Sequence, residues 1–203
     1  MKRLLSIAIA GIFFFHVQGL SQSKPFNTNW SQGLVVFNTG DSLDCLVRYN
    51  HALPVGILQI MKGENLFTVA PSDVKTFTFK DVDKDRLRKF YSIELEAEEG
   101  QPSHAFMECL YNNESVSILT HKTFGMPRDF MNYTWFISKP ARVNKRYIFD
   151  SETGKLLPMS RENALKVLDQ AKSQQVSAYI ENHRIRFRSV SEYIDVFEFH
   201  RSL

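Results

Sequence analysis

The chain has 203 residues, a formal net charge of +3 at pH 7 and 43% hydrophobic residues. This length fits one domain, or a domain with a small appendage, and can bury a sizeable core. Two of the positive charges lie in the N-terminal segment described next, so the remainder is nearly neutral. Its bulk charge gives no reason to expect a nucleic acid or an anionic membrane as a partner.

Residues 1–19 have the layout of a secretory signal peptide. Lys2 and Arg3 precede an almost uncharged run over residues 4–17, and small or modest residues follow at the spacing of a cleavage site. The apolar run is shorter than the roughly 20 residues that a spanning helix needs. We therefore expect an exported chain that starts near Leu20, resides in the periplasm or outside the cell, and has no transmembrane segment after cleavage.

Strand patterns dominate residues 20–158, which we interpret as one antiparallel β domain. Two apolar runs flank the turn at residues 38–41, and the Asn-Asn-Glu-Ser turn at residues 112–115 is flanked in the same way, so each predicts a β-hairpin. Short turns without intervening helices favour a sheet that curves into a sandwich or a barrel-like domain. The predicted strands are residues 34–37, 43–49, 57–61, 66–69, 76–80, 89–95, 104–111, 116–121, 133–137 and 146–149.

The hydrophobic period changes at Ser160, and residues 159–203 are expected to form a helical tail packed on the β domain. Ser160 can cap a helix over residues 161–172, and residues 176–182 suit a second short helix. The sequence from Ser189 to Glu192 has the form of a capping box and begins a third. The expected fold class is therefore α+β, an antiparallel sheet followed by about three short helices.

Cys45 and Cys109 are the two cysteines of the chain, and both fall in predicted strands. Export to an oxidising compartment would permit a disulfide between them. The alternative is two separately buried thiols, because a free cysteine packs as a small hydrophobic residue. Neither cysteine has the spacing of a redox or metal-binding motif.

A resemblance covers most of the chain beyond the expected signal peptide. The segments that carry it are Gly33-x-Val35 with the Thr39-Gly40-Asp41 turn, residues 71–77, the aromatic strand at residues 90–92, and tail motifs at Tyr179-Ile180 and residues 192–194. Together they resemble a loosely defined group of exported β-rich proteins from Bacteroidota that have a signal peptide and no assigned function. The resemblance implies an envelope location and a β domain with terminal helices, and it supplies no catalytic residues.

The search for catalytic, metal-binding and cofactor motifs leaves the catalytic residues unknown and predicts neither a metal nor a cofactor. No two histidines have ligand spacing, and the common nucleophile and phosphate-binding motifs do not occur. Asp81, Asp83 and Asp85 have the opening spacing of a calcium loop, but Arg86 stands where the loop needs glycine. We therefore interpret residues 81–88 as a solvated connection of mixed charge.

Two clusters are candidate interaction surfaces. Arg184, Arg186 and Arg188 alternate with apolar residues, and in an extended segment they could present guanidinium groups to phosphate or carboxylate; the alternative is a strand edge protected by charge. Tyr133, Trp135 and Phe136 could form a stacking surface for a sugar or a peptide, or pack in the core.

The leading functional hypothesis is a non-enzymatic binding or interaction module of the cell envelope. Its partner would be an envelope protein or a small ligand. The alternatives are an envelope hydrolase with dispersed catalytic residues and a barrel-like carrier of a small apolar ligand. A filled core with an exposed apolar patch would favour the interaction module.

Overall fold

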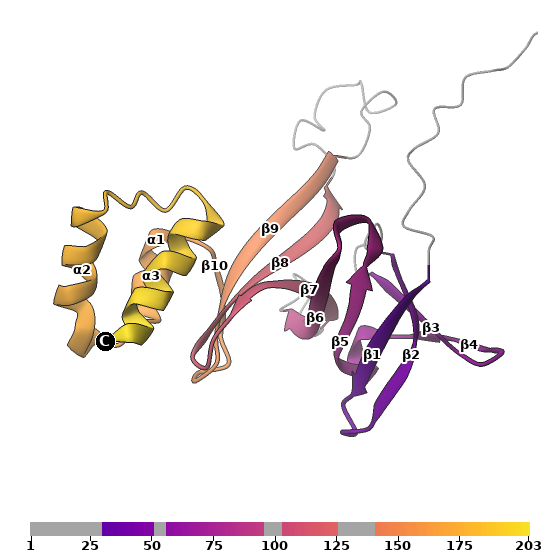
Figure 1. Ribbon diagram of the computed structural model, residues 1–203. Helices are drawn as coiled ribbons and strands as arrows, with labels where there is room; N and C mark the ends of the chain where they lie inside the picture. The colour runs from indigo at the N-terminus through magenta and orange to yellow at the C-terminus, as the bar shows by residue number, and fades with distance from the viewer. Residues whose placement is uncertain (1–29, 51–55, 96–102, 126–140) are drawn as a thin grey trace, which may run out of the picture.

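The fold is an antiparallel sheet of ten described strands followed by three short helices, as the sequence predicts (Figure 1). The structure is a computed structural model that describes residues 30–50, 56–95, 103–125 and 141–203. The sheet is not closed, and its order is β10-β9-β8-β7-β6-β5-β1-β2-β3-β4. The strands are β1 (Ser31–Phe37), β2 (Ser42–Asn50), β3 (Ile57–Lys62), β4 (Asn65–Val69), β5 (Val74–Asp81), β6 (Arg86–Leu95), β7 (Ser103–Asn112), β8 (Val116–Gly125), β9 (Ala141–Asp150) and β10 (Leu156–Pro158).

Both hairpins expected from their turn residues are present. In the β1–β2 turn, Gly40 has a φ of 94°, a conformation that costs glycine little, and the Phe37 N–H donates to the Asp41 carbonyl at 2.9 Å. In the β7–β8 turn, the Asn113 side-chain oxygen accepts hydrogen bonds from the backbone N–H groups of Ser115 and Val116. Local turn chemistry therefore fixes the register of both strand pairs.

Two hydrophobic cores lie on the same face of the sheet. Their residues can be assigned to this face because directly opposed residues on neighbouring strands lie on the same face. In the first core, Phe77 stacks on Phe90 with ring centroids 4.6 Å apart. The second core lies where the helices pack against β8 and β9. The first core contains Val35, Cys45, Val47, Leu58, Ile60, Val74, Phe77, Phe79, Phe90 and Phe106. The second contains Val116, Ile118, Ile148, Ala164, Leu168, Val176, Ile180, Tyr193, Val196 and Phe197.

The helical tail consists of α1 (Arg161–Lys166), α2 (Ser173–Asn182) and α3 (Val190–Ser202), which lie beside the β9 and β10 end of the sheet (Figure 1). The Ser160 side chain caps α1 as predicted. The helix expected to reach residue 172 instead ends at Lys166. Its continuation is a short 3₁₀ turn, η3 (Gln170–Lys172), which begins because the Asp169 side chain accepts a hydrogen bond from the Ala171 N–H.

The sheet differs from the sequence-based expectations in two places. The prediction of a solvated connection over residues 81–88 is wrong at both ends, since β5 continues to Asp81 and β6 begins at Arg86, with only η2 (Val82–Lys84) and Asp85 between them. The three-residue strand β10 was not predicted because it is too short to show alternation.

The expected signal peptide and the predicted strand at residues 133–137 lie outside the described residues. Of the helices in the described part of the chain, none has the length and apolar character to cross a membrane.

Candidate functional sites

The free edge of β4 combines open backbone groups with exposed apolar side chains. β4 pairs with β3 on one side and has no neighbouring strand on the other among the described residues. Phe67 lies opposite the buried Ile60, on the face that carries the cores, yet it is 50% exposed, and Leu66 is 54% exposed. None of the five residues of β4 is charged. The opposite edge, β10, is only three residues long and ends in Pro158, so it is protected against pairing in a way that β4 is not.

Residues 183–189 connect α2 to α3, and we call this segment the arginine loop. It is not an extended strand edge, which corrects both sequence-based interpretations of its backbone. Arg184, Arg186 and Arg188 are nevertheless exposed, as the alternation predicts. Ile185 and Phe187 between them pack against the second core. The arginines therefore project from a loop that is anchored at two apolar positions.

Glu192 in the first turn of α3 holds the backbone of the arginine loop. Its carboxylate accepts hydrogen bonds from the backbone N–H groups of Arg186 at 3.2 Å, Arg188, and Ser189 at 3.1 Å. These hydrogen bonds, that of Arg186 first, lower the pKa of Glu192 below its ordinary value, so the carboxylate stays ionised near neutral pH. The Ser189 side chain accepts from the Glu192 N–H in return, which completes the predicted capping box.

A buried ion network is centred on Glu108 of β7, which is 3% exposed. Arg88 donates to its carboxylate in bidentate fashion, from Nε at 2.9 Å and from Nη2 at 2.8 Å. Arg86 and Lys122 each donate once more, at 2.8 and 2.6 Å, and Arg88 Nη1 reaches Asp81 at 3.3 Å. The network therefore joins four neighbouring strands, β5 to β8, on the face that carries the two cores.

The charges of the network satisfy one another. Burial alone would raise the pKa of Glu108, but the hydrogen bonds and charges of Arg88 and Lys122 outweigh it and lower the pKa to about 2. Arg88 also lies over the rings of Phe79 and Phe90, 5.4 and 4.9 Å from their centroids. Because Glu108 accepts four hydrogen bonds and is ionised at neutral pH, it has no proton to donate as an acid and is poorly suited to act as a base.

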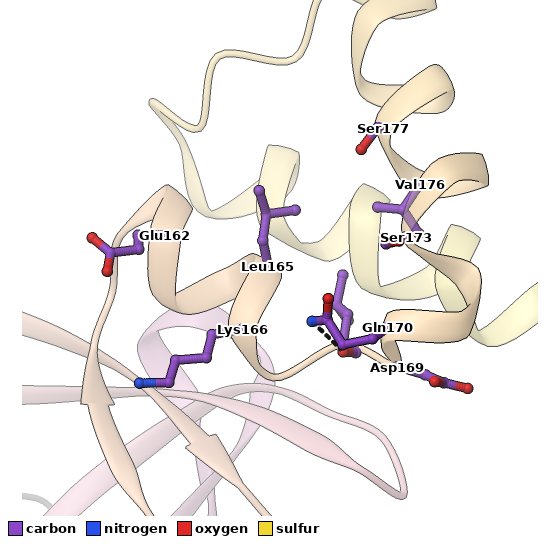
Figure 2. A pocket seen from close by; sticks show the side chains of 9 residues that line it. Glu162, Leu165, Lys166, Asp169, Gln170, Ser173, Val176 and Ser177 are labelled. Atoms are coloured by element: carbon purple, nitrogen blue, oxygen red, sulfur yellow. Dashed lines mark hydrogen bonds between the residues drawn. The ribbon is translucent and has the colours of Figure 1, made fainter.

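A hollow of about 470 Å³ lies between α1, η3 and α2. Figure 2 shows that Leu165 and Val176 face the space between the helices, whereas Glu162 and Lys166 extend away from α2. The described residues that line it include no histidine and no cysteine. The hollow has a mixed polar and apolar lining, and this lining brings no acid–base pair of the kind that a histidine or a thiol would supply.

The two cysteines singled out in the sequence are not bridged. Cys45 and Cys109 are free thiols, one on β2 and the other on β7, so the structure contains no bridge between them. Burial raises the pKa of both thiols. Tyr133, Trp135 and Phe136 lie outside the described residues, which also contain no group of three residues that could hold a metal ion.

The β4 edge and the ion network could not be predicted from the sequence, for different reasons. The β4 edge depends on strand order, which no local pattern reveals. The ion network had a weak signal in the alternation of Arg86 and Arg88 with Leu87, which is typical of a strand and not of a connection. Comparison of the chain with models of protein families, with curated proteins and with solved structures gave no match.

Proposed function

We propose that this chain is a non-enzymatic interaction module of the cell envelope, and that it pairs its β4 edge with an extended segment of an envelope protein. The observation that carries this proposal is the uncharged, unprotected β4 edge with Leu66 and Phe67 half exposed. The signal-peptide pattern of residues 1–19 and the resemblance to exported Bacteroidota proteins support the envelope location.

Strand addition would use the free side of β4. The backbone N–H and C=O groups on that side would form the hydrogen bonds of one more antiparallel or parallel ladder. An apolar side chain of the added segment would lie beside Phe67 and extend the first core across the new strand. Backbone pairing would supply affinity, and the contact with Phe67 would supply selectivity for segments with alternating apolar residues.

We also infer that strands β5, β1, β2, β3 and β4 curl in a barrel-like manner. In a flat sheet, β5 and β4 would lie four inter-strand steps apart, about 19 Å. The link between them, from Val69 to Val74, has five residue steps that could span at most about 17 Å if extended, and it includes the 3₁₀ turn η1 (Pro71–Asp73). Curling would bring Val69 toward β5, while the β3–β4 turn extends away from the other strands in Figure 1 and stays accessible.

The first core favours an interaction module over a carrier of a small apolar ligand. Tyr49, Phe77, Phe90 and Phe106 fill its centre, with ring centroids between Phe77 and each of the other three 4.6 to 5.2 Å apart. Rings in such contact leave no room for a ligand between them. A carrier would need this space to be empty.

The test is site-specific photo-crosslinking in intact native cells, with the crosslinker at residue 66 of the full chain. We expect a discrete crosslinked species containing one envelope protein. The variant L66K/T68K places two lysines on the exposed face of the edge strand, and its crosslinker is moved to residue 64. It should reduce the amount of this crosslinked species about tenfold, because lysines on an edge strand oppose strand pairing. Both positions are exposed, so the melting temperature should change little.

The matched control is Q32K/L34K, which places two lysines at the same spacing on the inner strand β1. Both side chains are exposed, and β1 already has neighbours on both sides. This variant should leave the crosslinked species unchanged. Equal loss in both variants, or no loss in L66K/T68K, would show that the β4 edge is not the binding surface.

A further inference from the structure

We propose that the arginine loop binds an acidic segment of a partner protein, at a site separate from the β4 edge. Arg184, Arg186 and Arg188 present three exposed guanidinium groups within five residues. The planar donor fork of each guanidinium matches the two oxygens of a carboxylate. The loop therefore offers three bidentate donors to aspartate and glutamate side chains.

The availability of the three guanidinium groups follows from the ion pairs of the described residues. Among the described residues, no ion pair involves Arg184, Arg186 or Arg188. The neighbouring carboxylate of Glu192 accepts hydrogen bonds from the backbone N–H groups of the same loop, and attraction to the charge of Arg188 is the smallest of the influences on its pKa. The loop therefore uses its backbone for its own structure and leaves its arginine side chains for another molecule.

The backbone of the loop is held in a costly conformation. Arg184 and Phe187 have φ values of 52° and 58°, in the left-handed region where glycine or asparagine is usual. Arg184 follows α2 at the position where helices commonly end in glycine, and the Ile185 N–H closes the turn on the Ile180 carbonyl at 3.0 Å. Arginine at that position costs stability, and within the described ranges no ion pair compensates for it, as expected for a residue that serves binding.

Local charge complementarity favours an acidic polypeptide over an anionic membrane. Arg161 adds a fourth guanidinium, 5.9 Å from the ring centroid of Phe187, but Glu181 and Glu192 flank the loop. A bilayer presents a plane of phosphates that these carboxylates would repel, and broad binding to it needs a larger basic surface. A single acidic segment can contact the exposed arginines one by one and avoid the flanking carboxylates.

The experiment measures binding of a fluorescein-labelled hexaglutamate peptide to the full chain by fluorescence anisotropy at low salt. Loss of three exposed arginine–carboxylate pairs should weaken binding of R184Q/R186Q/R188Q about tenfold or more. The control K75Q/K145Q/R146Q removes the same net charge from three exposed positions on β5 and β9, and it should stay within about twofold of the unaltered chain. Equal weakening in both variants would overturn the proposal, as would no binding by the unaltered chain.

Two further measurements separate binding from folding and peptide from lipid. R184G should weaken hexaglutamate binding yet raise the melting temperature, because glycine relieves the positive φ at this position. Vesicles containing phosphatidylglycerol should bind weakly, with no difference between the unaltered chain and the triple glutamine variant. Binding to the vesicles through the three arginines, without binding to hexaglutamate, would assign the loop to a membrane and overturn the proposal.

Discussion

Arg88 and Glu108 show why a charged residue can be buried in a small sheet. Each is less than a tenth exposed, and two hydrogen bonds join them. Burying a charge is expensive, and this cost offsets much of the stabilisation that the pair provides. The main effect of the pair is to specify which strands must be neighbours. The network therefore fixes β6 against β7 in a register that the surrounding aromatic residues alone would specify less strictly.

The first prediction concerns acid stability. The folded-state pKa of Glu108, about 2, lies below the ordinary value of 4.5, so the unfolded chain binds the extra proton at intermediate pH. The stabilisation is therefore fully present above about pH 5 and is lost as the pH falls toward 2, by about 3 kcal/mol in total. Urea unfolding of the full chain at several pH values measures the fall in the free energy of unfolding with falling pH, which we call the acid slope.

Glu108→Gln is the informative variant. At pH 7 it should lower the free energy of unfolding by about 3–5 kcal/mol, because Arg88 remains buried and loses the closer of its two counter-charges, keeping only the longer contact with Asp81. It should also lack the part of the acid slope that Glu108 contributes. Glu94→Gln, at an exposed position of β6, should leave both properties unchanged. The same acid slope in E108Q and in the unaltered chain would contradict the assignment of this slope to Glu108.

Among the elements, the junction between α2 and α3 depends most on a single side chain. Glu192 accepts hydrogen bonds from three N–H groups of the arginine loop, whereas Ser189 accepts one from the first turn of α3. The two halves of the capping box therefore have different roles. Ser189 caps the helix, and Glu192 orders the loop that precedes it.

The second prediction follows from this division. Glu192→Gln should speed hydrogen exchange at the backbone N–H groups of Arg186, Arg188 and Ser189, because a neutral amide accepts these hydrogen bonds less strongly than a carboxylate. Ser189→Ala should instead cost about 1 kcal/mol of stability, with its effect centred on the first turn of α3. Exchange monitored by NMR resolves the two patterns. Identical patterns in both variants would contradict the separate roles.

Local sequence signals predicted most elements but few of their contacts. The hairpin turn at Gly40 and the cap at Ser160 depend on residues adjacent in the chain, and both were predicted. The placement of β1 between β5 and β2, and the meeting of Arg88 with Glu108 twenty residues away, depend on pairing between distant segments. Sequence alone could therefore identify the three arginines of the loop but not the loop conformation or the exposed β4 edge.

At the scale of the whole molecule, two cores share one continuous sheet. The first lies among strands β1 to β7, and the second joins β8 and β9 to the helices. The Glu108 network lies on the same face, on β5 to β8, between the aromatic rings and the helical tail. Strand pairing is therefore continuous across the molecule, whereas hydrophobic packing is divided.

The third prediction is that the two cores can be destabilised separately. Phe197→Ala and Phe77→Ala each remove a ring that is at most 1% exposed, at a cost of about 3–5 kcal/mol. F197A should lose hydrogen-exchange protection first in α1 to α3 and in β8 and β9, and F77A first in β1, β2 and β5. Hydrogen exchange with mass spectrometry measures both patterns. Uniform loss of protection in each variant would indicate a single cooperative unit.

The arrangement of the sheet has a mechanical consequence. The β4 edge and the helical tail lie at opposite ends of the strand order, so partners held at both places would pull across the strands. Antiparallel hydrogen bonds run perpendicular to the strands, and such a load would act along them and not shear them. Strand pairs that are joined by a hairpin turn, such as β7 and β8, would then separate and release slack chain while the turn kept the two strands joined. Under tension, the molecule would lengthen gradually and absorb the load before breaking the link between its partners.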